Sequence, residues 1–174
     1  MREAGIVEVL RSALQICVKT SRGLTGLQGV QEMLVGGADD ERKRSEQECD
    51  FPIGEKLKSD NFKGTVWLNM LTPSGTACPI GNVTFEPGCR NNWHTHAGGQ
   101  VLLVTGGRGY YQEWGKPARE LHPGDVVTIP ADVKHWHGAA KDSWFVHLAI
   151  EVDPEKGPAS WREPVSNEDY DKLR

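Results

Sequence analysis

The sequence predicts an all-β domain, an antiparallel sandwich or barrel, that follows an N-terminal helical extension. Three observations support this fold class. The chain of 174 residues contains 20 glycines and 10 prolines, and this density of turn-forming residues favours many short strands over long helices. Strand-forming segments recur about every ten residues with turn signals between them, as in antiparallel β-folds. Hydrophobic residues make up 37% of the chain, which indicates a folded domain rather than a disordered chain.

Apolar residues at helical spacing predict two helices at the N-terminus. They are Ile6, Val9, Leu10, Ala13, Leu14 and Cys17 in the first helix, and Leu24, Leu27, Gln31 and Leu34 in the second. A nearly continuous polar run over 39–48 follows and indicates a solvated helix or a linker. We therefore expect a helical segment over 1–37, a charged linker over 38–60, the barrel over 61–153 and a C-terminal tail over 154–174.

The expected barrel strands follow one another with recognisable turns between them. They cover 65–71, 82–85, 100–104, 110–114, 126–129 and 144–150. Glu86-Pro87-Gly88 suits a type II turn, because proline fits its second position and glycine its third. Gly106-Gly107-Arg108-Gly109 predicts a hairpin bend that returns the next strand along 100–104. His122-Pro123-Gly124-Asp125 predicts another turn, which would place His122 at the surface.

Composition narrows the classes of partner. The net charge of −4 leaves no basic excess for binding nucleic acid. The longest apolar runs are far shorter than the roughly 20 residues that span a bilayer. The first residues lack the basic start and apolar stretch of a signal peptide, and the four cysteines show no C-x-x-C spacing. We expect a cytoplasmic protein whose partner is a small-molecule substrate, with no nucleic acid and no membrane.

Most of the histidines form a pattern that points to a metal. His94 and His96 are two residues apart, which places both imidazoles on one face of a strand. Gln100 shares that face if the strand continues without a bulge. His135 and His137 repeat the spacing about 40 residues later. Imidazoles from two segments and an amide inside one barrel would form a cage for a divalent metal.

Two long motifs resemble those of the cupin superfamily. Gly88 to Gly106 resembles the first cupin motif, G-x5-H-x-H-x3,4-E-x6-G, and Gly124 to His135 resembles the second, G-x5-P-x-G-x2-H. The resemblance covers about 61–151 and implies a jelly-roll barrel with a metal inside. Two positions depart from the motifs, since Gln100 replaces the usual glutamate and Asp132 replaces a glycine.

A narrower resemblance extends over Val83 to Ile150. This segment is similar to small bacterial cupins that include manganese-dependent hydroxynitrile lyases. The metal ligands that this resemblance implies are His94, His96, Gln100 and His135, and the implied cavity-lining acid–base residues are His137 and His147. Manganese is the implied metal, with zinc, iron, nickel and cobalt as alternatives, and a homodimer is the expected assembly.

The residues allow an alternative to each of these assignments. Gln100 could point elsewhere and leave three histidines on the metal. His137 could hydrogen-bond a group behind the ligands, and His147 could be structural. If Gln100 does bind, an uncharged set of ligands leaves a divalent site with formal charge +2, which makes it more Lewis acidic than a site with a glutamate ligand.

These residues support three functional hypotheses. The first is a metal-dependent enzyme acting on a small hydroxy or carbonyl compound, in the manner of a hydroxynitrile lyase that cleaves a carbon–carbon bond. The second is a dioxygenase with iron or copper. The third is a non-catalytic module that binds a metal and a small ligand.

The N-terminal segment has a resemblance of its own. Gly5 to Leu34 resembles the last two helices of carboxymuconolactone decarboxylase-like domains. The catalytic cysteine pair of that family is absent, because Cys17 and Cys49 stand alone. We therefore expect a helical remnant without decarboxylase activity.

Overall fold

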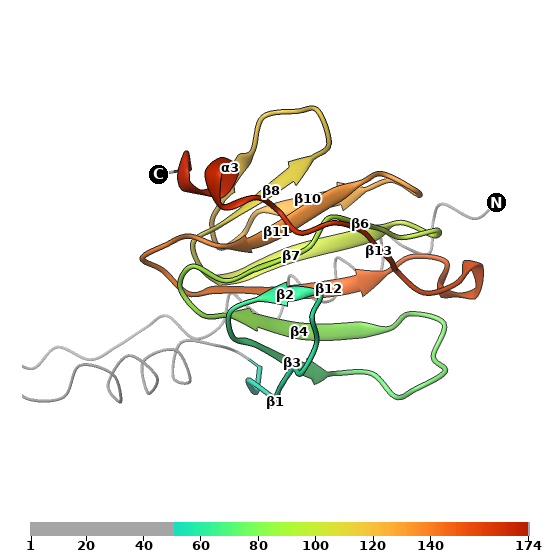
Figure 1. The fold of residues 1–174 in the computed structure, drawn as a ribbon. Helices are drawn as coiled ribbons and strands as arrows, with labels where there is room; N and C mark the ends of the chain where they lie inside the picture. Colours follow the sequence, from blue (N-terminus) through green and yellow to red (C-terminus); the bar gives the residue numbers. More distant parts are fainter. Residues whose placement is uncertain (1–50, 174) are drawn as a thin grey trace, which may run out of the picture. The chain divides into compact units, whose positions relative to one another are not determined.

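Two antiparallel sheets enclose a shared core in the computed structural model, which describes residues 51–173 (Figure 1). One sheet has six strands, in the order β1 (Glu55–Lys56), β3 (Val66–Met70), β4 (Ile80–Phe85), β12 (Phe145–Glu151), β7 (Gln100–Gly107) and β10 (Val126–Ile129). The other has seven, namely β13 (Ser160–Trp161), β6 (His94–Thr95), β11 (His135–Ala139), β5 (Arg90–Asn91) and β2 (Phe62–Lys63), with β8 (Gly109–Glu113) and β9 (Arg119–Leu121) joined through β8 to β11.

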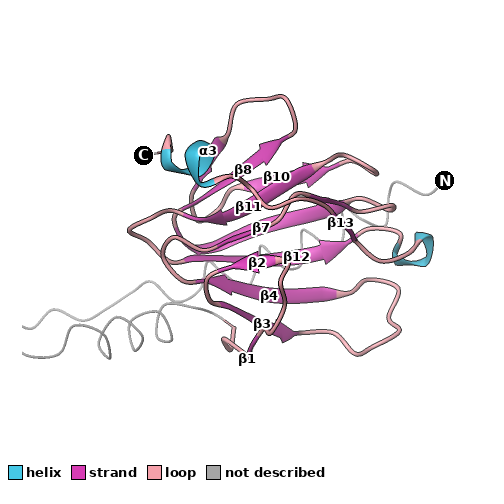
Figure 2. Ribbon diagram, viewed as in Figure 1, coloured by secondary structure: helices cyan, strands magenta, loops and turns pink. Residues whose placement is uncertain are grey.

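Strands dominate the described residues, and the predicted all-β jelly-roll fold is confirmed (Figure 2). Short helical turns follow β12 at η1 (Pro154–Lys156) and near the C-terminus at α3 (Asn167–Asp171). None of the helices within 51–173 is long and apolar enough to cross a lipid bilayer. The two helices expected in 1–37 lie outside the described residues.

Alternating burial along the strands explains how the sheets close on a core. In β7, Gln100, Leu102 and Val104 are buried, while the residues between them are half-buried, as the two-residue period of a strand requires. Their apolar members pack between the sheets against Phe85 and Phe145, which are also buried. The buried face of β7 is thus apolar except at its first residue, Gln100.

The turn expected at Glu86-Pro87-Gly88 forms as the sequence indicates. Gly88 has a φ of 79°, and the amide of Cys89 donates to the carbonyl of Glu86 at 3.0 Å. A positive φ at the third position is what a type II turn demands of its glycine.

The hairpin expected at Gly106-Gly107-Arg108-Gly109 is wrong. β7 pairs with β12 and β10, whereas β8 pairs with β11 and β9, so the chain crosses between sheets here. Gly107 permits the crossing, because its φ is 67° and a Cβ there would lie 1.8 Å from the carbonyl oxygen of Trp144. The backbone of Arg108 then makes two hydrogen bonds. Its amide donates to the carbonyl of Trp144 at 2.8 Å, and its carbonyl accepts from the amide of Ala140 at 3.0 Å.

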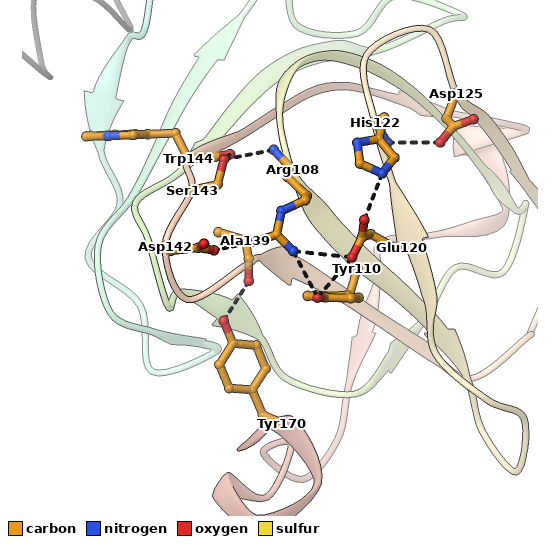
Figure 3. Close-up of polar contacts among 10 residues, drawn as sticks. All are labelled: Arg108, Tyr110, Glu120, His122, Asp125, Ala139, Asp142, Ser143, Trp144 and Tyr170. Atoms are coloured by element: carbon orange, nitrogen blue, oxygen red, sulfur yellow. Dashed lines mark hydrogen bonds and ion pairs between the residues drawn. The ribbon is translucent and has the colours of Figure 1, made fainter. Parts of the chain in front are cut away.

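Polar side chains surround this crossing at the surface (Figure 3). The Arg108 guanidinium donates to Tyr110 and to Glu120, each at 3.2 Å, and also pairs with Asp142. His122 lies 2.8 Å from Glu120, and its side chain is 57% exposed. His122 is therefore a surface residue, as expected, and exposed ion pairs of this kind contribute little to stability.

The segment expected to be a tail packs on the second sheet. Ser166 caps α3 by accepting from the amide of Asp169 at 3.0 Å. Tyr170 is buried, and its hydroxyl donates to the carbonyl of Ala139 in β11 at 2.6 Å (Figure 3). The buried guanidinium of Arg90 lies 4.1 Å from the Tyr170 ring centroid. Residues Glu55–Lys56, which the sequence assigned to the linker, form β1.

Replacing Tyr170 by phenylalanine is expected to lower the free energy of unfolding by about 1 kcal/mol, the usual net worth of a buried hydrogen bond. The ring stays, so the stacking with Arg90 stays. Urea unfolding would measure the change, with Glu168→Gln on the exposed side of α3 as the control. A Tyr170→Phe protein as stable as the control would show that this bond contributes nothing.

Candidate metal centre

Three of the predicted ligands meet where β6 approaches β11. His94 and His135 are register partners across these strands, and their ring centroids are 4.2 Å apart. The ring of His96, one residue beyond β6, lies 5.0 Å from His94 and 5.6 Å from His135. All three side chains are buried. The two-residue spacing of His94 and His96 does bring both rings to one cluster.

Gln100 reaches the same cavity by a different route from the one expected. The strand of His94 does not continue, because the chain turns after His96, whose carbonyl accepts from the amide of Gly99 at 3.1 Å. Gly99 has a φ of 89°. Gln100 then begins β7 in the opposite sheet, so the condition for the parity argument, a strand that continues past His96, is not met. It is the facing of the two sheets that lets Gln100, His94 and His96 line one cavity.

Backbone carbonyls fix the orientation of two imidazoles. The Nδ1 atom of His94 lies 2.9 Å from the carbonyl oxygen of Asn92, and Nδ1 of His135 lies 2.8 Å from that of Val133. Burial lowers the pKa of His135 to about 4 and that of His94 well below its usual value, so both rings are neutral at pH 7. A neutral ring that donates from Nδ1 keeps its lone pair on Nε2.

A carboxylate that the motifs did not include contacts the other two predicted ligands. Oε2 of Glu151 accepts from Nδ1 of His96 at 2.8 Å, and Oε1 accepts from Nε2 of Gln100 at 3.0 Å. The sequence carried one signal for it, because Glu151 has the same strand parity as His147. Glu151 also corrects the charge expected for the site, since the uncharged ligands have a negative group directly behind them.

Three of the buried side-chain atoms that have no hydrogen-bond partner within 51–173 are of the kinds that bind divalent metals. The Nε2 atoms of His96 and His135 and the Oε1 atom of Gln100 are buried without a hydrogen-bond partner. Buried polar atoms without partners are rare and costly, and they call for an explanation. Imidazole nitrogens and an amide oxygen are ligands for Mn²⁺, Fe²⁺, Ni²⁺ and Zn²⁺, so these residues fit a bound divalent metal.

His137 stands next to this set but has both ring nitrogens engaged. His94, His135 and His137 form a triad in which one nitrogen of each ring lies within 4.8 Å of one nitrogen of each of the other two. Nε2 of His137, however, lies 3.0 Å from the side-chain amide of Asn91, and Nδ1 lies 3.1 Å from Nε2 of His147. Hydrogen bonding therefore favours His96 and Gln100 over His137 as ligands beside His94 and His135.

Asn91 determines which tautomer His137 adopts. The Oδ1 atom of Asn91 accepts from the backbone amide of His137 at 2.9 Å, so Nδ2 faces Nε2 of the ring and donates to it. Nδ1 of His137 then carries the proton and donates to His147. Burial lowers the pKa of both histidines, which keeps the pair neutral. Sequence reasoning missed Asn91, because its role depends on the pairing of β5 with β11.

The cavity in front of these residues is small and largely apolar. Its volume is about 220 Å³, below the roughly 300 Å³ at the lower end for drug-sized ligands. Asn91, His94 and His137 line it, as does Trp161, which stacks on His94 with ring centroids 4.7 Å apart and is 36% exposed. Trp161 was missed because no cupin motif includes it and it lies in the expected tail.

The buried pair of His147 and His137 predicts acid-sensitive stability. Burial lowers the pKa of His147 from 6.5 to about 3. Between pH 3 and pH 6.5 the unfolded chain binds a proton at His147 that the folded chain does not. The contribution of His147 to the free energy of unfolding is therefore complete above pH 6.5. It is lost as the pH falls towards 3, at a rate of up to about 1.4 kcal/mol per pH unit.

Urea unfolding of chelator-treated protein at several pH values would measure this slope. The His147→Gln variant has no titrating group at the position, and its stability should fall less steeply below pH 6.5. Comparison of slopes is independent of any loss of stability that the substitution itself causes. Parallel slopes for the two proteins would contradict the prediction.

Comparison with known proteins agrees with the fold and with the motifs. The cupin domain family model matches residues 81–151. An (R)-mandelonitrile lyase of Granulicella tundricola is 44% identical over 117 residues, which are 66% of this chain and 89% of that protein. The crystal structure of a cupin-like protein from Thermotoga maritima is 49% identical, with a TM-score of 0.69 over 71% of this chain and 95% of that one.

A DMSP lyase from Ruegeria pomeroyi shares the fold, with a TM-score of 0.56 and 16% identity over 93% of this chain and 95% of that one. The two cupin motifs, the barrel and these relatives agree, and the chain belongs to the cupin family.

Proposed function

We propose that this chain is a metal-dependent lyase that cleaves a small cyanohydrin into a carbonyl compound and hydrogen cyanide. The observation that carries the proposal is the cluster of partnerless donor atoms on His96, Gln100 and His135 beside a cavity that His137 also lines. The similarity to a protein named (R)-mandelonitrile lyase supports this reaction for the present chain.

The proposed metal site consists of His94, His96, Gln100 and His135. A divalent metal held there would supply Lewis acidity to the oxygen of the substrate and stabilise negative charge on it. Manganese as that metal, a homodimeric assembly and a cytoplasmic location stay predictions.

We assign the proton transfer to His137. Its Nε2 lone pair accepts from Asn91, and a substrate hydroxyl that replaces this amide as donor can transfer its proton there. The carbon–carbon bond to the nitrile breaks, the carbonyl forms, and the same proton passes from Nε2 to the departing cyanide. His147 does not line the cavity and only accepts from Nδ1 of His137, so we assign it a positioning role.

The walls of the cavity favour a substrate with an apolar, aromatic side group. Phe62 and Trp161 meet edge to face, with ring centroids 5.4 Å apart, and Leu57 and Leu68 line the same cavity. A ring on the substrate could pack against either of them edge to face or offset-stacked, the arrangements that aromatic pairs prefer. Apolar walls also lower the local polarity, which strengthens electrostatic interactions near the ligands.

Mandelonitrile tests the proposal directly. Protein loaded with Mn²⁺ should release benzaldehyde and cyanide in equal amounts, at the same rate with and without oxygen, and chelator treatment should abolish the activity. Oxygen consumption with an iron- or copper-loaded protein would support the dioxygenase hypothesis. Metal-dependent binding of small carbonyl compounds without any turnover would support the binding module.

A further inference from the structure

We infer that Glu151 is a positioning residue that turns the donor atoms of His96 and Gln100 towards the metal and supplies the negative charge that the ligands lack. The inference rests on the metal centre of the proposed function. It adds a carboxylate, contributed by β12, to a set of proposed ligands that is itself uncharged.

The fold holds Glu151 against Gln100. The two residues are register partners across β12 and β7, and directly opposite residues on neighbouring strands point to the same face. The backbone on either side is fixed as well, because the amide of Glu151 donates to Pro79 at 3.0 Å and that of Val152 donates to Gly99 at 3.1 Å. The backbone therefore holds Glu151 at the cavity that it lines.

Both carboxylate oxygens are used, and each orients one ligand. Because an ionised carboxylate only accepts hydrogen bonds, the contact at 2.8 Å requires a proton on Nδ1 of His96, and the contact at 3.0 Å requires the amide nitrogen of Gln100. The opposite atoms, Nε2 of His96 and Oε1 of Gln100, are then the ones that face the cavity, and both are buried without a partner. Glu151 thus determines which atom of His96 and which atom of Gln100 faces the cavity.

The negative charge of Glu151 is a second way in which this residue would affect metal binding. A glutamate at position 100 would cancel one unit of metal charge by direct coordination. Here an amide takes that position and the carboxylate stands one hydrogen bond further out. Groups that hold metal ligands in this way contribute roughly 10- to 100-fold to metal affinity.

Glutamine is the sharpest substitution at position 151, because it matches glutamate in shape but cannot accept from both ligands through two oxygens. Its single oxygen can accept from one of them, and its amide nitrogen must face the other. Either His96 then carries its proton on Nε2, where the metal would bind, or Gln100 turns its nitrogen towards the cavity. Glu155→Gln is the matched control, since it removes the same charge from an exposed residue four positions along the chain.

Equilibrium binding of Mn²⁺ tests the inference with a readout other than activity. The dissociation constant of Glu151→Gln should be at least tenfold weaker than that of the unmodified chain, whereas Glu155→Gln should match the unmodified chain. Nitrogen-15 NMR of the metal-free proteins should show His96 protonated on Nδ1 in the unmodified chain and in Glu155→Gln. In Glu151→Gln, either the His96 tautomer should change or the Gln100 amide resonances should shift.

The outcomes separate this inference from the metal centre itself. An unmodified chain that binds no Mn²⁺ would overturn the proposed centre and the inference together. If the unmodified chain binds Mn²⁺ and Glu151→Gln binds it as tightly as Glu155→Gln does, with the His96 and Gln100 resonances unchanged, the inference alone is overturned.

Discussion

Replacing His135 by alanine is expected to remove the bound metal and to lower kcat/KM for cyanohydrin cleavage by about three orders of magnitude or more. The substitution deletes an Nε2 atom that is buried without a partner, opposite His94 in the strand pairing. Lewis acid stabilisation of a developing oxyanion is worth several kcal/mol, and each 1.4 kcal/mol is about tenfold in rate. Elemental analysis and the mandelonitrile assay on the same preparation would measure both effects.

The barrel should stay folded in this variant. The apolar core lies between the sheets around Phe85, Phe145 and Leu102, and circular dichroism should be unchanged. His122→Ala is the control, because it removes an exposed imidazole on the surface. Stoichiometric metal in both His94→Ala and His135→Ala would refute the site.

Replacing His137 by alanine is expected to leave one metal per chain and to lower kcat by roughly 10²- to 10⁴-fold, the usual contribution of a general acid or base. The expectation of retained metal follows from the ring nitrogens of His137, which already contact Asn91 and His147. The expectation of lost turnover follows from its place on the cavity wall. Metal content and steady-state kinetics together distinguish the two roles.

This variant also decides between the two possible ligand sets. Loss of metal in His137→Ala, with metal retained in His96→Ala, would move the centre to the triad of His94, His135 and His137. Retained metal with unchanged kcat would instead remove His137 from the proton transfer. We expect His137→Ala to retain the metal and to have a reduced kcat, whereas we expect His135→Ala to lose the metal.

The cupin motifs could be identified because their spacing is local. Two histidines at i and i+2 share a face in any strand, and strand periodicity with turn residues predicts β3, β4, β7 and β12 without knowledge of the partners. Gly88 fits the same rule, since a type II turn depends on four consecutive residues. The fold class and the positions of the candidate histidines therefore came from short-range patterns.

Contacts between distant residues lay beyond those patterns. His96 and Glu151 are 55 residues apart in sequence, and Asn91 and His137 are 46 apart. The expected hairpin after β7 failed for the same reason, because a glycine-rich bend does not specify which strand the chain joins next. The two-residue period of a strand also stops at the turn before Gln100, so parity could not place that residue.

By itself, the sequence determined a β-barrel of the cupin family and predicted His94, His96, Gln100 and His135 as metal ligands, because motif spacing and strand periodicity act over a few residues. The tertiary structure alone decided that Glu151 stands behind two of those residues, that Asn91 and His147 occupy both nitrogens of His137, and that Trp161 covers His94. Strand pairing within a sheet brings Asn91 to His137 and Glu151 to Gln100, and the facing of the two sheets brings Glu151 to His96 and His147 to His137. Both kinds of contact join residues far apart in the sequence, which no short-range pattern specifies.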